Sequence, residues 1–204
     1  MSKAIMKKLS CVPALLLALA VLAACGSKTE MPKDYAAPAV LSAEQQRVLD
    51  AVSTDKQEYL LFDFTTESTY KRVEFWVETY ENGSLADAKL AAADISYDTA
   101  KPVSGTLSAI ISHNPEYVWT LVYSGSGGKV FQTGEPSEKY LTEAKAYGRL
   151  NGAVEIENGK EIILYACVFS KNTAIEAFDI RQFQDAKELE KYEYAHVLKC
   201  RFSA

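Results

Sequence analysis

Apolar and polar residues alternate along most of the chain after residue 58, with the period of two that a half-buried β-strand requires. The alternation is clear from residue 70 to residue 80, where apolar side chains at positions 73, 75 and 77 are interleaved with Glu74, Trp76 and Glu78. Further strands are expected over residues 59–64, 85–97, 103–112, 117–124, 129–133, 150–156, 162–169 and 194–202.

Short turn signals connect these runs. Asn82-Gly83 and Asn158-Gly159 offer the positive φ angles that a two-residue hairpin turn needs, so each is expected to join its flanking strands directly. Tight turns favour antiparallel pairing, because parallel strands need crossovers of a dozen residues or more. The pattern therefore predicts a mostly β protein, a single antiparallel β-sandwich or partly open β-barrel.

Two or three short helices complete this expectation. Apolar residues return at helical spacing over residues 43–52, and Ser42 with Gln45 three residues later has the form of a capping box. Ser137 is expected to cap a helix over 137–146, and Asp185 a short one over 185–189.

The first 25 residues follow another pattern. Three lysines, at positions 3, 7 and 8, precede an apolar run over 12–22 that is too short and too interrupted by Pro13 to span a membrane comfortably. Small residues follow in Leu22-Ala23-Ala24-Cys25, which resembles the lipobox of bacterial lipoproteins. The resemblance implies a signal peptide over 1–24, a diacylglyceryl group on the sulfur of Cys25, and attachment to the extracytoplasmic face of the cell membrane.

Three segments are predicted from this: the signal peptide 1–24, a flexible tether 25–40 with prolines and no periodicity, and a β-rich globular domain 41–204. Loss of the three lysines leaves 19 of the 22 basic residues against 27 acidic ones, a formal charge of −8 for the mature chain. An acidic surface argues against nucleic acid or anionic lipid headgroups as partners.

Cysteine and histidine are scarce. After processing, Cys167 and Cys200 remain, either as a disulfide, which an extracytoplasmic location permits, or as two buried thiols. A Cys-His nucleophile pair formed with His196 would need an exposed thiol of low pKa, which the apolar surroundings do not favour. His113 is the other histidine, so no metal site and no cofactor is expected.

One surface row stands out as a candidate binding site. Trp76, between Glu74 and Glu78 and followed by Tyr80, could stack on a sugar ring or hold a cationic group. The alternative is that the helix 43–52 covers Trp76 and that the glutamates form a solvated strand edge. The two carboxylates are about 13 Å apart along a strand, too far for an acid and nucleophile pair.

The C-terminal run Tyr-Glu-Tyr-Ala-His-Val-Leu-Lys-Cys-Arg-Phe, residues 192–202, resembles the ending of uncharacterised small lipoproteins of Gram-positive bacteria. That group implies no activity and no site.

The sequence is compatible with three functions. The first is a membrane-anchored, non-enzymatic module that binds a protein, peptide or glycan. The second is a carrier of a small apolar ligand, with residues such as Phe62, Trp119 and Tyr165 around a barrel cavity. The third is a hydrolase built on carboxylates.

Overall fold

The computed structural model describes residues 31–54, 56–67, 69–97, 101–113, 117–125, 128–134, 144–171 and 174–204. From Pro32 onward, these residues belong to one compact unit that extends to Ala204. The predicted signal peptide, Cys25 and most of the predicted helix 137–146 lie outside the described residues.

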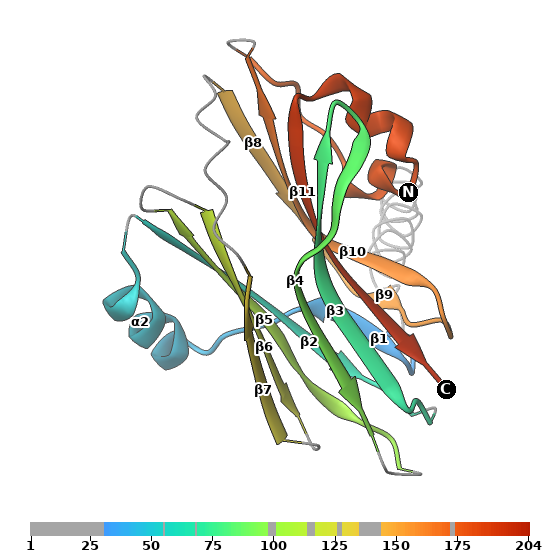
Figure 1. Cartoon of the computed structure of the whole chain (residues 1–204). Coiled ribbons are helices and arrows are strands. Elements are labelled where there is room, and N and C mark those ends of the chain that lie inside the picture. Colours follow the sequence, from blue (N-terminus) through green and yellow to red (C-terminus); the bar gives the residue numbers. More distant parts are fainter. Residues whose placement is uncertain are drawn as a thin grey trace, which may run out of the picture. The chain divides into compact units, whose positions relative to one another are not determined.

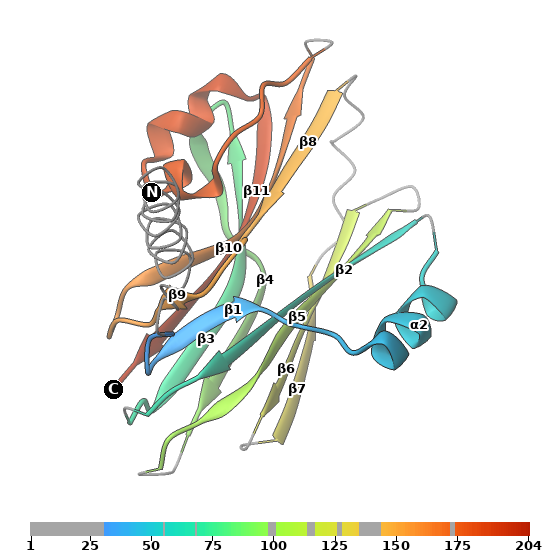
Figure 2. The ribbon, with the colours of Figure 1, turned by 180° about the vertical axis from the view of Figure 1, so that it is seen from behind.

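The described strands form two antiparallel sheets packed face to face as a β-sandwich, without closing into a barrel (Figures 1 and 2). The six-stranded sheet has the order β7-β6-β5-β2-β1-β9 and the five-stranded sheet the order β4-β3-β11-β10-β8. The bounds of the first sheet are β1 Tyr35–Pro38, β2 Gln57–Thr65, β5 Ser104–His113, β6 Tyr117–Gly125, β7 Gly128–Thr133 and β9 Val154–Glu155. Those of the second are β3 Arg72–Glu81, β4 Ser84–Ser96, β8 Ala144–Arg149, β10 Glu161–Ser170 and β11 Tyr194–Ser203. The mostly β class predicted from the alternation is confirmed.

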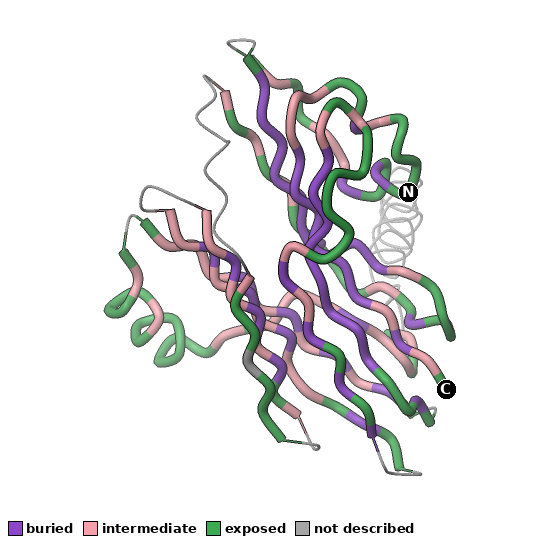
Figure 3. The backbone as a smooth tube through the Cα atoms, in the orientation of Figure 1, coloured by how far each residue is buried: buried purple, intermediate pink, exposed green. Residues whose placement is uncertain are grey.

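One hydrophobic core lies between the sheets. Phe64 of the six-stranded sheet packs on Phe202 of the five-stranded sheet with ring centroids 5.1 Å apart, and Trp119 packs on Tyr165 at 6.1 Å. β3 and β10 are buried on both faces, because they lie inside their sheet and side chains also cover its outer surface (Figure 3). A strand of this kind presents no free face to a ligand.

The helices are few. α2 spans Ala43–Val52, and its capping box between Ser42 and Gln45 is present as predicted. Two 3₁₀ helices follow β10: η1 over Ile180–Gln184 and η2 over Ala186–Lys191, the second capped by Asp185 as expected. The helix predicted to reach residue 146 is wrong at its end, since β8 already begins at Ala144.

The two Asn-Gly turns have different outcomes. Asn82 and Gly83 adopt φ angles of 48° and 77° and join β3 to β4 as a hairpin, as predicted. The hairpin predicted at Asn158-Gly159 is wrong, because β9 pairs with β1 of the six-stranded sheet while β10 pairs with β8 and β11. The turn is present, with Gly159 at φ 73°, but it carries the chain from one sheet to the other.

The predicted tether also needs correction. Residues 35–38, assigned to the flexible segment 25–40, form β1 and pair with both β2 and β9. Ala36 is fully buried in the core. This proline-containing segment therefore forms a strand with short apolar side chains, and not a linker. The β domain therefore begins before residue 41, and a tether would be limited to residues 25–34.

Candidate functional site

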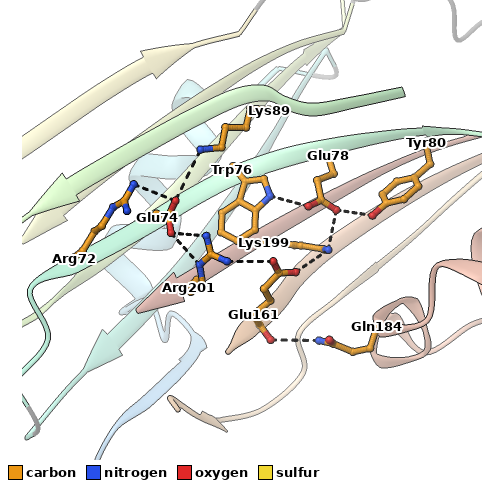
Figure 4. Close-up of polar contacts among 10 residues, drawn as sticks. All are labelled: Arg72, Glu74, Trp76, Glu78, Tyr80, Lys89, Glu161, Gln184, Lys199 and Arg201. Atoms are coloured by element: carbon orange, nitrogen blue, oxygen red, sulfur yellow. Dashed lines mark hydrogen bonds and ion pairs between the residues drawn. The ribbon is translucent and has the colours of Figure 1, made fainter. Parts of the chain in front are cut away.

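The row predicted as a binding surface, Glu74, Trp76, Glu78 and Tyr80, is covered by other side chains, and we call it the closed row. Glu74, Trp76, Glu78 and Tyr80 are all buried, so the expectation that they form an exposed surface is wrong. The expected cover by the helix 43–52 is wrong as well, because α2 lies against Leu61 of the other sheet. Basic side chains of the neighbouring strands cover the row instead (Figure 4).

Each glutamate of the row is held by cations. Glu74 contacts Arg201 at 2.7 Å, Arg72 at 3.3 Å and Lys89 at 3.8 Å, so β3, β4 and β11 all contribute. Glu78 contacts Lys199 at 2.8 Å, measured from Nζ to Oε2. These pairs leave neither carboxylate free for a ligand, since their charge is already compensated within the sheet.

Trp76 is fixed in this network from two directions. Its indole N–H donates to Glu78 at 3.0 Å, and the Arg201 guanidinium lies over its ring at 5.4 Å from the centroid. Tyr80 donates its hydroxyl to the other oxygen of Glu78 at 2.6 Å. The aromatic face expected to stack on a sugar is therefore occupied by the protein's own cation.

The protonation of Glu78 does not suit acid catalysis. Burial raises its pKa, but hydrogen bonds from Lys199, Tyr80 and Trp76 outweigh this and hold the pKa below its ordinary value. Glu161 contacts the same ammonium at 3.0 Å, so Lys199 stands between two carboxylates. A glycosidase of the usual kind needs one carboxyl of raised pKa as general acid, and Glu78 is shifted in the opposite direction.

Cys167 and His196 lie directly opposite each other on β10 and β11. Both are buried, and burial raises the pKa of the Cys167 thiol to about 12 while it lowers the pKa of His196 to about 3. At neutral pH both groups are uncharged, so they form no reactive thiolate and imidazolium pair. His196 instead contacts the Thr79 hydroxyl at 3.1 Å through Nδ1.

The possible disulfide between Cys167 and Cys200 is absent, and both thiols are free and buried. Cys200 lies opposite Ile162, four residues along β11 from the position opposite Cys167. Four residues of strand span about 13 Å, whereas a disulfide requires Cα atoms within about 7 Å.

A second row, which the sequence analysis missed, lies open to solvent. Lys145, Tyr147 and Arg149 alternate along β8, which among the described strands pairs with β10 alone, and all three are exposed. We call these three residues the β8 row. They lie opposite Phe169, Cys167 and Tyr165, on the face of the sheet that turns toward the other sheet.

The small residues of β8 explain this orientation. Ala144, Ala146 and Gly148 occupy the opposite face. A Cβ at Gly148 would lie 2.7 Å from Ile180 and 3.0 Å from Phe178, so η1 packs closely on that side. The period of two in Ala-Lys-Ala-Tyr-Gly-Arg is the signal that identifies the strand.

The β8 row lies beside groups from both sheets. Tyr147 stacks on Tyr165 with centroids 6.4 Å apart and ring planes at 18°, and Tyr165 donates to Glu58 of β2 at 3.0 Å. Lys145 reaches Tyr117 of β6, with Nζ 3.5 Å from the hydroxyl. Arg149 lines two hollows, one of about 270 Å³ shared with β2 and α2 and one of about 170 Å³ shared with Phe178–Arg181.

The residues proposed to line a carrier cavity are core residues. Phe62, Trp119 and Tyr165 are all fully buried and belong to the hydrophobic core shared by the two sheets. Because the sheets do not close into a barrel, these side chains fill the space between layers.

In the part of the chain that the structure describes, no group of three or more His, Cys, Asp or Glu side chains is arranged to hold a metal ion. No helix there combines the length and apolar character needed to cross a membrane.

Comparison with known proteins gives one match. Residues 36–202 match the family model described as the YgaN domain. No curated protein and no solved structure matches the chain. The matched range begins within β1 and ends within β11, so it includes both sheets.

Proposed function

The chain belongs to the YgaN domain family, and we propose that its mature form is a lipid-anchored module on the extracytoplasmic face of the cell membrane that binds an extended, acidic peptide segment of a partner protein. The anchor rests on the order of charge, apolar run and small residues that ends at Cys25. Two or more acyl chains on this cysteine would hold the domain stably at the membrane.

The β8 row is the observation that carries the binding role. Tyr147 is 56% exposed, and it is the only aromatic residue among the large exposed apolar residues of the described chain. Tyrosine and arginine dominate the energetics of protein interfaces, since each combines a large contact area with directional polar groups. The exposed aromatic ring between two cations is therefore a suitable binding surface.

The mature chain is acidic as a whole, so an anionic partner would be recognised only by a local group of cations, and the β8 row is such a group. Lys145 and Arg149 lie four residues apart on one face, which is about 13 Å along a strand. An extended peptide presents side chains with the same period, so acidic residues at i and i+4 can meet both cations while the residue between them contacts Tyr147. Among the described strands, β8 stands at the edge of its sheet, which is the position where a bound peptide adds a strand.

Binding is favoured over catalysis by the groups beside the row. The carboxylate of Glu58 accepts a hydrogen bond from the Tyr165 hydroxyl. The ammonium of Lys145 donates a hydrogen bond to the Tyr117 hydroxyl. The thiol of Cys167 on β10 and the imidazole of His196 on β11 are buried and neutral. These groups hold the row in place but supply no nucleophile or general acid to it.

The anchor is tested by mass spectrometry of the protein extracted from membranes. We expect a mature N-terminus at Cys25 that carries acyl chains, and release of the Cys25→Ala variant from the membrane fraction. An unacylated N-terminus, or a chain that still begins at Met1 inside the cell, would contradict the anchor.

Binding is tested with the mature anchored protein in lipid nanodiscs, using fluorescently labelled eight-residue peptides that carry glutamate or lysine at alternate positions. We expect the glutamate peptide to bind, and Tyr147→Ala and Arg149→Glu each to weaken binding about tenfold or more. Leu85→Ala, at an exposed position on β4, is the control and should bind as the wild type does. Equal binding of both peptides, unchanged affinity of Tyr147→Ala, or selective binding of neutral glycans would overturn the peptide assignment.

A further inference from the structure

Helix α2 lies outside the sandwich beside the six-stranded sheet, and both views agree on this (Figures 1 and 2). None of its ten residues is buried, and Val48 and Val52, one turn apart, are 57% and 58% exposed. A helix of this length is not stable in water on propensity alone, so its apolar side needs a contact. Its own domain supplies only part of one (Figure 3).

An open apolar groove separates α2 from the sheet. Its volume is about 390 Å³, and Leu61 of β2 forms its floor. Four apolar side chains from the helix and the segment before it line the groove: Leu41, Val48, Leu49 and Val52. The polar residues Ser42, Glu44 and Gln45 line it at the start of the helix. The valines at the rim face solvent, which gives the groove an apolar entrance.

Exposed apolar residues gather near the predicted anchor. Seven large apolar residues of the described chain are exposed, and four of them fall within residues 31–52: Met31, Val40, Val48 and Val52. The other three, Leu85, Val130 and Tyr147, lie on three different strands. Exposed apolar side chains concentrated in one segment mark an interaction site, whereas scattered ones need no explanation.

We infer that this apolar side of α2 lies in the lipid bilayer and fixes the orientation of the domain on the membrane. The inference rests on the proposed lipid anchor. Tyr35, the first residue of β1, stands ten positions after Cys25, and even fully extended this stretch reaches only about 33–36 Å. The proposed anchor therefore keeps the start of β1 close to the bilayer, and this short tether gives the nearby surface of the domain, α2 included, a high effective concentration of lipid.

The contact is apolar rather than ionic. The helix carries Glu44 and Asp50 against the single cation Arg47, and the mature chain as a whole is acidic. Anionic headgroups would not attract such a surface, so insertion depends on the valines and leucines. Binding should consequently be no stronger in anionic than in zwitterionic lipid, and added salt should not weaken it.

The test uses the acylated mature protein reconstituted in phosphatidylcholine vesicles, with tryptophan placed at position 48 or, as a second variant, at position 52. Acyl chains brominated near the headgroup quench tryptophans that lie about 5–10 Å below the interface. We expect Val48→Trp and Val52→Trp to be quenched about twofold or more and their emission to shift to the blue. Leu85→Trp is the matched control on β4 and should respond to neither.

The outcomes are distinguishable. Vesicle flotation reports the anchor separately, so floating protein with unquenched tryptophan at both positions overturns the inference and leaves the proposed function intact. Protein that does not float overturns both. A blue shift that appears only when many chains share one vesicle, without quenching by bromine, would mean that a second copy or another protein covers α2, and it too overturns the inference.

Discussion

Two rows of this molecule have the same sequence pattern and opposite environments. Glu74, Trp76 and Glu78 on β3, and Lys145, Tyr147 and Arg149 on β8, each place an aromatic residue between two like charges on one face of a strand. Trp76 is 5% exposed and Tyr147 is 56% exposed. The position of the strand in its sheet makes the difference.

β3 has a neighbour on each side, and those neighbours supply the opposite charge. Lys199 and Arg201 of β11 lie directly opposite Trp76 and Glu74, and Lys89 reaches Glu74 from β4. β8 has one neighbour, β10, which places Tyr165 and apolar groups opposite the row. Alternation identifies the residues that share a face, whereas the neighbouring strands determine whether that face remains open.

The largest effect expected from this difference is on stability. Trp76→Ala removes a buried indole, the hydrogen bond to Glu78 and the surface under Arg201, and should lower the free energy of unfolding by about 3–5 kcal/mol. Tyr147→Ala, on the open row, should cost less than about 1 kcal/mol. Urea unfolding curves of both variants measure the difference, and similar losses would show that the two rows are equally built into the fold.

A second change addresses the charge compensation of the closed row. Lys199→Met leaves Glu78 buried without its cation and should cost about 3 kcal/mol, while the double variant with Glu78→Gln should recover at least about half of that loss. Lys160→Met removes the cation of an exposed pair with Glu157 and should cost less than about 1 kcal/mol. If the double variant is less stable than Lys199→Met alone, charge compensation is not what holds the row.

A third change concerns the covered side of β8. Gly148→Ala places a methyl group 2.7 Å from Ile180, so either η1 or β8 must move, and the cost should be about 1–3 kcal/mol. Gly152→Ala is the matched control, since nothing lies within 4 Å of its Cβ position. Because β8 carries Tyr147, the Gly148 variant should also bind the acidic peptide more weakly. If both its affinity for the peptide and its stability equal those of the wild type, the contact with η1 does not position β8.

Much of the fold follows from local pattern. The strands near residues 59–64, 70–80 and 194–202 are where alternation predicts them, as are the capping box at Ser42 and the Asn82-Gly83 hairpin. Pairing over longer distances does not follow. The turn at Asn158-Gly159 has the right residues for a hairpin, but β1 offers β9 a partner in the other sheet, and that contact depends on residues more than 100 positions away.

The candidate sites show the same limit. The two Glu residues beside Trp76 indicate an exposed row only if no cation lies on the adjacent strand, and the sequence does not tell which strand is adjacent. The β8 row was hidden because Tyr140, Leu141 and Ala144 have helical spacing, which obscured the alternation that begins at Ala144. Local periodicity was ambiguous there, and only the pairing of β8 with β10 decides it.

The buried histidine between the two rows and the row on β3 should lose stability in different ranges of pH. His196 lies on β11, opposite Thr79 of β3 on one side and Cys167 of β10 on the other, and burial holds its pKa near 3, below the ordinary value of 6.5. Between these values the unfolded chain binds a proton that the folded chain does not, so stability falls as the pH decreases from about 6.5. One proton corresponds to about 1.4 kcal/mol per pH unit.

Urea unfolding at pH 7, 6, 5, 4 and 3 of the wild type, His196→Gln and Glu78→Gln measures these contributions. The pKa of His113 is also lowered by burial, so both histidines contribute to the slope of the unfolding free energy against pH in the wild type. In His196→Gln this slope should be smaller by the contribution of one proton. The pKa of Glu78 is shifted below its ordinary value of 4.5, and stability from the closed row is therefore lost only below that pH. Glu78→Gln should have the wild-type slope of unfolding free energy against pH between pH 6.5 and 5 and a different slope below pH 4.5. The reverse pattern would assign the acid sensitivity above pH 5 to the closed row.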